Sequence, residues 1–95
     1  MTVVIHIKDS CGTNDEVYIG RPSKWGNPFI LKYEKDRSKI ISQYKDWILE
    51  KIKNEEITKE DILTLKDKRL MCYCKPRACH GDILVALVNY YDRKD

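Results

Sequence analysis

Three of the chain's four cysteines and one of its two histidines fall within one twelve-residue segment, MCYCKPRACHGD at positions 71–82. Thiol and imidazole groups bind zinc, and a thiol beside an imidazole can serve as a nucleophile with its base. Lys75 and Arg77 add positive charge that would attract an anion. The segment therefore predicts a metal centre, a reactive thiol or an anion-binding loop, unless it is only a turn between a strand and a helix.

The metal interpretation has one plausible ligand set, three thiols and an imidazole from Cys72, Cys74, Cys79 and His80. Structural zinc sites usually use pairs of cysteines separated by two or more residues. Here one pair is separated by a single residue, and Cys79 directly precedes His80. The spacing therefore argues against zinc, which stays as the alternative to a site without any cofactor.

The end of the segment favours anion binding. A helix that begins at His80, Gly81 and Asp82 would present backbone N–H groups to a phosphate, with Arg77 nearby. Cys79 beside His80 would be the nucleophile if the chain is an enzyme, with His80 and Asp82 as the acid–base pair. The structural alternative is that the cysteines before the helix are buried strand residues and that Asp82 only caps the helix.

A second candidate site is the segment GRPSKWGNPF at positions 20–29. Its glycines and prolines exclude a regular helix or central strand. The segment supplies groups for a phosphate, an aromatic ring and an amide edge, and we predict ligand-binding roles for Arg21, Ser23, Lys24, Trp25 and Asn27. The alternative is a structural loop in which Trp25 and Phe29 fill the core.

The elements that would position these residues follow from hydrophobic patterning. The pattern predicts two early strands, over residues 3–7 and 16–19, and the first of them has Val3, Ile5 and Ile7 on one face. It predicts a later strand over residues 70–74, with Leu70, Cys72 and Cys74 on one face. Apolar residues at helical spacing predict a helix over 38–53, a shorter one from Thr58 with Asp61 completing a capping box, and a last helix from His80–Asp82. The predicted order β-β-α-α-β-α indicates a small layered α/β or α+β fold.

Length and composition limit the possible functions. A length of 95 residues fits a single domain, 1–95. A net charge of +3 is too small for the basic stripe of a nucleic-acid-binding protein, so nucleic acid is not the favoured partner. No apolar run is long enough for a membrane span, and the first residues lack the layout of a signal peptide. We therefore expect a cytoplasmic protein with reduced cysteines. Because so short a chain has little room for a deep pocket, we also expect a homo-oligomer.

From VYIGRPSKWGNPF to LMCYCKPRACHGDILVALVN, roughly Val17 to Asn89, the chain resembles a small family of uncharacterised domains from prokaryotes and their viruses. The motifs that carry the resemblance are the GRPSKWGNP-type loop and the tripeptide His80-Gly81-Asp82. The segment that ends in Cys79-His80 is more loosely similar to the motif of a second uncharacterised family. That motif reads cysteine-histidine-arginine, and this chain has Gly81 in place of the arginine. The first resemblance implies that the two segments form one site.

The combined hypothesis is a domain that binds a nucleotide-like or other phosphorylated small molecule between the GRPSKWGNP loop and the CHGD helix start. The occurrence in viruses of the family that the chain resembles implies either a nucleotide-processing enzyme or a viral protein that sequesters a nucleotide signal. The rival hypothesis is a zinc-stabilised module that binds a protein or a nucleic acid.

Overall fold

A three-stranded parallel sheet forms one layer of the protein. The computed structural model describes residues 2–21, 23–30, 32–73 and 79–94. The strands are β1 (Val3–His6), β2 (Glu16–Tyr18) and β3 (Arg69–Cys72), and their order in the sheet is β1-β3-β2. Both outer strands run parallel to β3, which comes from much later in the chain.

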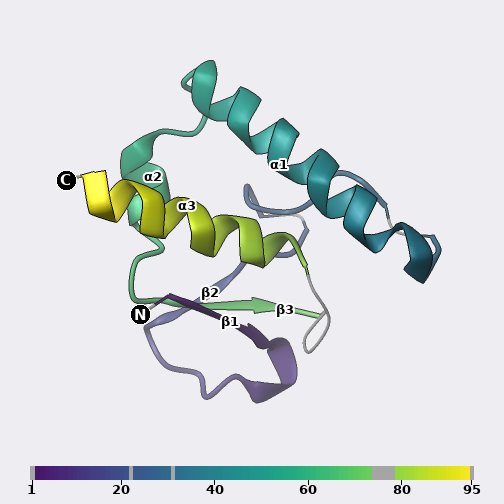
Figure 1. Ribbon diagram of the computed structural model, residues 1–95. Helices are drawn as coiled ribbons and strands as arrows, with labels where there is room; N and C mark the ends of the chain where they lie inside the picture. The colour runs from purple at the N-terminus through teal and green to yellow at the C-terminus, as the bar shows by residue number, and fades with distance from the viewer. Residues whose placement is uncertain (1, 22, 31, 74–78, 95) are drawn as a thin grey trace.

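Three helices form the second layer, and Figure 1 shows them on the same side of the sheet. They are α1 (Arg37–Lys53), α2 (Lys59–Leu63) and α3 (His80–Lys94), and short 3-10 turns, η1 (Ile7–Asp9) and η2 (Glu34–Asp36), follow β1 and precede α1. The order of elements and the mixed α/β class agree with the prediction from sequence.

The core lies between the two layers. All three helices contribute fully buried side chains that join Leu70 of the central strand: Tyr44, Ile48, Ile62, Leu84 and Val88. The predicted capping box of α2 is present, because Thr58 Oγ1 accepts the Asp61 N–H at 3.1 Å and Asp61 Oδ2 accepts the Thr58 N–H at 3.0 Å. Amphipathic periodicity and capping residues therefore located the helices correctly.

The first strand is shorter than the predicted range 3–7, and the face of Val4 is the one that packs against the core. Val4 aligns with Leu70 and packs against the core, whereas Val3 is 37% exposed and Ile7 belongs to η1. Residues 3–5 are all apolar, so no alternation marks the inner face, and a shift by one residue exchanges the two faces. On β3 the prediction for Leu70 and Cys72 is confirmed, since both are buried; Cys74 lies outside the described residues.

Within the described part of the chain, no helix combines the length and the apolar character needed to cross a membrane.

Candidate functional site

A cavity of about 340 Å³ opens where the neighbouring parallel strands β2 and β3 end. Its walls come from the loop after β2, the first turns of α1, the end of β3 and the start of α3. Its lining residues are Tyr18, Gly20, Arg21, Asn27, Phe29, Arg37, Ile40, Ile41, Cys72, Tyr73, Cys79 and His80. The carboxyl ends of parallel strands are the usual place for ligands in α/β sheets. The cavity brings the two predicted segments together.

The loop over residues 20–29 is held by its own backbone. The Ser23 N–H donates to the Gly20 carbonyl at 2.9 Å, and the Gly26 N–H donates to the Ser23 carbonyl at 3.0 Å. Asn27 Oδ1 accepts the Phe29 N–H at 2.9 Å, the local bond that asparagine makes in turns. These bonds hold the turns at Ser23 and Asn27 that position the lining residues of this loop.

The middle of this loop faces away from the cavity, contrary to the predicted ligand-binding roles. Trp25 is only 6% exposed and belongs to the core, so its ring is not placed to stack on a ligand, and the structural alternative applies to it. Lys24 lies over the Trp25 ring, and its Nζ is 3.3 Å from Asp61 Oδ2. Ser23 Oγ is buried and has no hydrogen-bond partner among the described residues. None of the three residues lines the cavity.

Two arginines give the cavity its charge. Arg37 is oriented by Glu34, since Nε lies 2.7 Å from Oε1 and Nη2 lies 3.0 Å from Oε2. Arg21 is exposed, and its guanidinium makes no ion pair with any described residue. The described lining residues include no carboxylate. Because Glu34 offsets the charge of Arg37, the positive charge that the described lining residues offer to an anion comes mainly from Arg21.

His80 is held at the first position of α3. It is buried, and its Nε2 lies 2.7 Å from the Ile19 carbonyl oxygen. A carbonyl can only accept, so Nε2 carries a proton, and the second ring nitrogen, Nδ1, is left as the acceptor in the neutral form. Nδ1 has no partner among the described residues. A fixed tautomer with a vacant basic nitrogen suits an acid–base group.

Cys79 and Asp82 share the capping of α3. The Cys79 Sγ accepts the Gly81 N–H at 3.3 Å, and Asp82 Oδ2 accepts the Cys79 N–H at 3.3 Å. Asp82 does not line the cavity, so its position fits the structural alternative better than a ligand-binding or acid–base role. Gly81 is buried, and an added Cβ would lie 2.9 Å from both Ile19 Cδ1 and Val4 Cγ2. The glycine therefore allows the start of α3 to lie directly on the sheet.

Two of the three cysteines of the predicted site, Cys72 and Cys79, are described by the structure, and they lie together. Cys72 and Cys79 both line the cavity, and their Sγ atoms are 3.2 Å apart. Three other residues singled out in this segment, Cys74, Lys75 and Arg77, lie outside the described residues. Among residues 2–21, 23–30, 32–73 and 79–94, no three His, Cys, Asp or Glu side chains are grouped as metal ligands. The zinc set that includes Cys74 thus stays a prediction.

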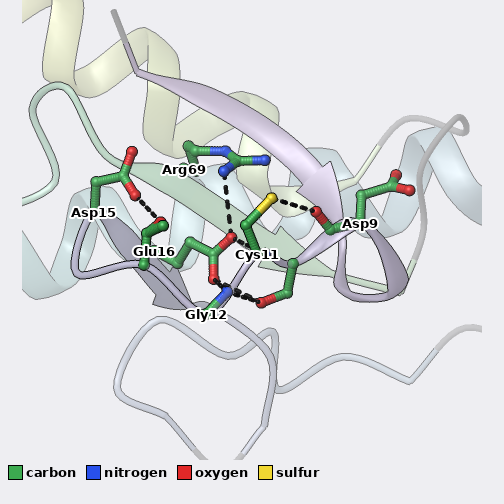
Figure 2. Close-up of polar contacts among 8 residues, drawn as sticks. Asp9, Cys11, Gly12, Asp15, Glu16 and Arg69 are labelled. Carbon is green, nitrogen blue, oxygen red and sulfur yellow. Dashed lines mark hydrogen bonds and ion pairs between the residues drawn. The ribbon is translucent and has the colours of Figure 1, made fainter.

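Cys11 lies apart from this site, in the loop between η1 and β2 (Figure 2). The loop is organised by Glu16, whose carboxylate accepts the Ser10 hydroxyl at 2.6 Å and the Cys11 and Gly12 N–H groups at 2.8 and 3.0 Å. Arg69 Nη1 is 3.4 Å from the same carboxylate. Cys11 is exposed and is not part of the cavity.

Sequence reasoning missed half of the lining residues. Arg37 stands just before the apolar stripe of α1. Tyr18 is the last residue of β2 and Tyr73 directly follows β3, and residues at the ends of parallel strands are the ones that face a ligand. Tyr73 is 65% exposed, with its ring 6.4 Å from the Tyr18 ring. Aromatic residues at strand ends and a basic residue at the start of a helix were thus the available signal. The other missed residues are Phe29, which was assigned only a core role, and Ile40 and Ile41, which were assigned to the core stripe of α1.

Comparison with known proteins identifies relatives of the chain. A curated protein from Enterobacteria phage T4, described as an uncharacterized 12.4 kDa protein in the nrdA-td intergenic region, is 39% identical over 80 residues, which cover 84% of this chain and 73% of the phage protein. No solved structure matches significantly. The model of a domain of unknown function, DUF4326, matches residues 5–90 and so includes every described residue that lines the cavity. The chain therefore belongs to the DUF4326 family.

Proposed function

We propose that the cavity binds a small phosphorylated molecule of the nucleotide class. The observation that carries the proposal is the pair Arg21 and Arg37 beside the aromatic lining residues, of which Tyr73 is exposed, with no carboxylate among the described lining residues. Guanidinium groups bind phosphate by paired, charge-assisted hydrogen bonds. Arg37 is already oriented by Glu34, so less side-chain entropy is lost when it binds.

The aromatic contact is assigned to a different residue from the one predicted. Tyr73 is exposed at the cavity and forms an edge-to-face contact with Tyr18, whereas Trp25 is in the core. A base or sugar would lie against Tyr73 and Phe29 while the phosphate meets the arginines. A volume of about 340 Å³ lies at the small end of ligand cavities, which favours a mononucleotide or sugar phosphate over a longer ligand.

The test is calorimetric titration of the full chain with nucleoside mono-, di- and triphosphates, cyclic nucleotides, a sugar phosphate and inorganic phosphate. Arg21→Ala should weaken binding of the best compound about 10- to 100-fold, since a charge-assisted contact contributes about 1.5–3 kcal/mol. The matched control is Arg93→Ala, because Arg93 is an exposed arginine near the end of α3. If no phosphorylated compound binds, or if the two variants lose affinity equally, the proposal fails.

The same cavity would support turnover as well as binding. His80 has a fixed tautomer with Nδ1 as a possible base, and Cys79 Sγ also lines the cavity. Incubating the chain with each compound that binds, and analysing the mixture by mass spectrometry, distinguishes an enzyme from a protein that only binds its ligand. Recovery of unchanged ligand supports a binder that sequesters a nucleotide, a role consistent with a relative encoded by a phage. New products that His80→Gln abolishes support an enzyme.

A further inference from the structure

Two cysteines that are seven positions apart in sequence meet at the wall of the cavity. Cys72 ends the central strand β3, and Cys79 directly precedes α3. Their sulfur atoms are 3.2 Å apart, and the residues are 1% and 2% exposed. A disulfide needs about 2.0 Å between its sulfurs. The strand end and the helix start therefore hold the two thiols within about 1.2 Å of bonding distance.

We propose that Cys72 and Cys79 form a reversible intramolecular disulfide, with a hydroperoxide as the oxidant. The proposal does not depend on the ligand of the cavity. It differs from the zinc alternative, because it needs only the two sulfurs that the structure places together.

The two sulfurs have different roles in this reaction. Cys79 Sγ accepts the Gly81 N–H at 3.3 Å at the start of a fifteen-residue helix, and both features stabilise negative charge on the sulfur. Cys79 is therefore the attacking thiolate. Cys72 is the resolving thiol, because its sulfur is in contact with that of Cys79. Both residues line the cavity, which gives a small oxidant access to sulfurs that are otherwise buried.

The chemistry balances in two steps. The Cys79 thiolate attacks one oxygen of the peroxide, the O–O bond breaks, and the sulfur becomes a sulfenic acid while the other oxygen leaves as water or alcohol after taking a proton. The Cys72 sulfur then attacks the sulfenic sulfur, the S–O bond breaks, and water leaves as the disulfide forms. Two thiols and one peroxide thus give a disulfide, with two protons and two electrons transferred. A dithiol reductant reverses the change by thiol–disulfide exchange.

The experiment uses the full chain with Cys11→Ser, because Cys11 is exposed and would form bonds between molecules. The protein is treated with hydrogen peroxide, denatured, and alkylated with N-ethylmaleimide. Three cysteines remain in this variant, so the number of alkylated thiols should fall from three to one and return to three after dithiothreitol. Circular dichroism before treatment establishes that the variant is folded.

The pairing is assigned with three further variants in the same background. Cys74→Ser should still form the bond, giving no alkylated thiol after oxidation, whereas Cys72→Ser and Cys79→Ser should not. Trypsin would leave residues 70–77 and 78–93 as separate peptides, because the bond from Lys75 to Pro76 resists cleavage. The oxidised Cys74→Ser protein should yield these two peptides joined.

Three outcomes overturn the proposal. Complete alkylation after peroxide treatment of the folded protein shows that the thiols do not pair. A bond that persists in Cys72→Ser shows that Cys74 is the partner of Cys79. Stoichiometric zinc in the purified chain, lost from Cys72→Ser and Cys79→Ser alike, shows that the two sulfurs hold a metal instead. None of these results decides whether the cavity binds phosphate.

Discussion

At the scale of single residues, Glu16 joins four partners outside the cavity: Ser10, Cys11, Gly12 and Arg69. Its side chain is 4% exposed, and the loop around Cys11 is built on its two oxygens (Figure 2). The Ser10 hydroxyl, and after it the Cys11 N–H, hold the pKa of Glu16 below its ordinary value of 4.5. The lowered pKa means that the fold favours the carboxylate form.

Glu16→Gln should destabilise the protein at neutral pH, because an amide offers one acceptor oxygen where the carboxylate offers two. A lowered pKa gives stability that is present above the ordinary value and is lost as pH falls through the folded-state value. The difference between wild type and variant should therefore shrink as pH drops below 4.5. Urea unfolding midpoints over this pH range measure it, with the exposed Asp46→Asn on α1 as control. A difference that is independent of pH would contradict this role of the carboxylate.

At the scale of elements, the position of α3 depends on the absence of a side chain at Gly81. An added Cβ would lie 2.9 Å from Ile19 Cδ1 and from Val4 Cγ2, both on the sheet side of the interface. The middle residue of the CHGD motif thus has a packing role. Since His80 and Cys79 flank it, this packing also fixes two lining residues of the cavity.

Gly81→Ala should lower the free energy of unfolding by on the order of 1 kcal/mol. Overpacking costs about 1–3 kcal/mol, and the better helix propensity of alanine returns up to about 1 kcal/mol. Chemical denaturation measures the loss, and Asn89→Ala on the exposed part of α3 should stay within about 0.5 kcal/mol of wild type. Equal or greater stability of Gly81→Ala would show that Ile19 and Val4 move aside at no cost.

At the scale of the whole molecule, Tyr44 joins parts of the chain that are distant in sequence. It is fully buried in α1, its hydroxyl donates to the Trp25 carbonyl at 2.8 Å, and its ring lies 5.0 Å from the His80 ring. Burial, with a smaller contribution from charge on Cys79, raises the pKa of Tyr44 well above its ordinary value of 10.0. The tyrosine therefore stays a neutral donor in the fold.

Tyr44→Phe should cost about 1–3 kcal/mol, because the buried Trp25 carbonyl loses its partner. The raised pKa gives stability that is complete below the ordinary tyrosine value and declines as pH rises above it, when only the unfolded state ionises. The variant should therefore lose less stability than wild type between about pH 9 and 11. Thermal unfolding at several pH values measures both effects. Parallel curves for the two proteins would contradict the predicted ionisation behaviour.

The sequence was sufficient where a local pattern decides the structure. The apolar stripe around Tyr44 and Ile48, the capping box at Thr58 and the start of α3 at His80 all follow from helical spacing and capping chemistry. The pairing of the strands depends on contacts between distant residues and was not predictable. The same holds for Trp25, since an aromatic residue in an irregular loop has the same local sequence whether it fills a core or contacts a ligand.

The position of β3 between β1 and β2 has a consequence for synthesis of the chain on the ribosome. Both outer strands are complete once Tyr18 has been added, but the strand that separates them is complete only at Cys72. The nascent chain therefore carries two strand segments without their sheet partner for on the order of a few seconds, at typical elongation rates. The sheet and the cavity at its end form only after β3 has been synthesised, so until then the unpaired strand segments are exposed to aggregation and proteolysis.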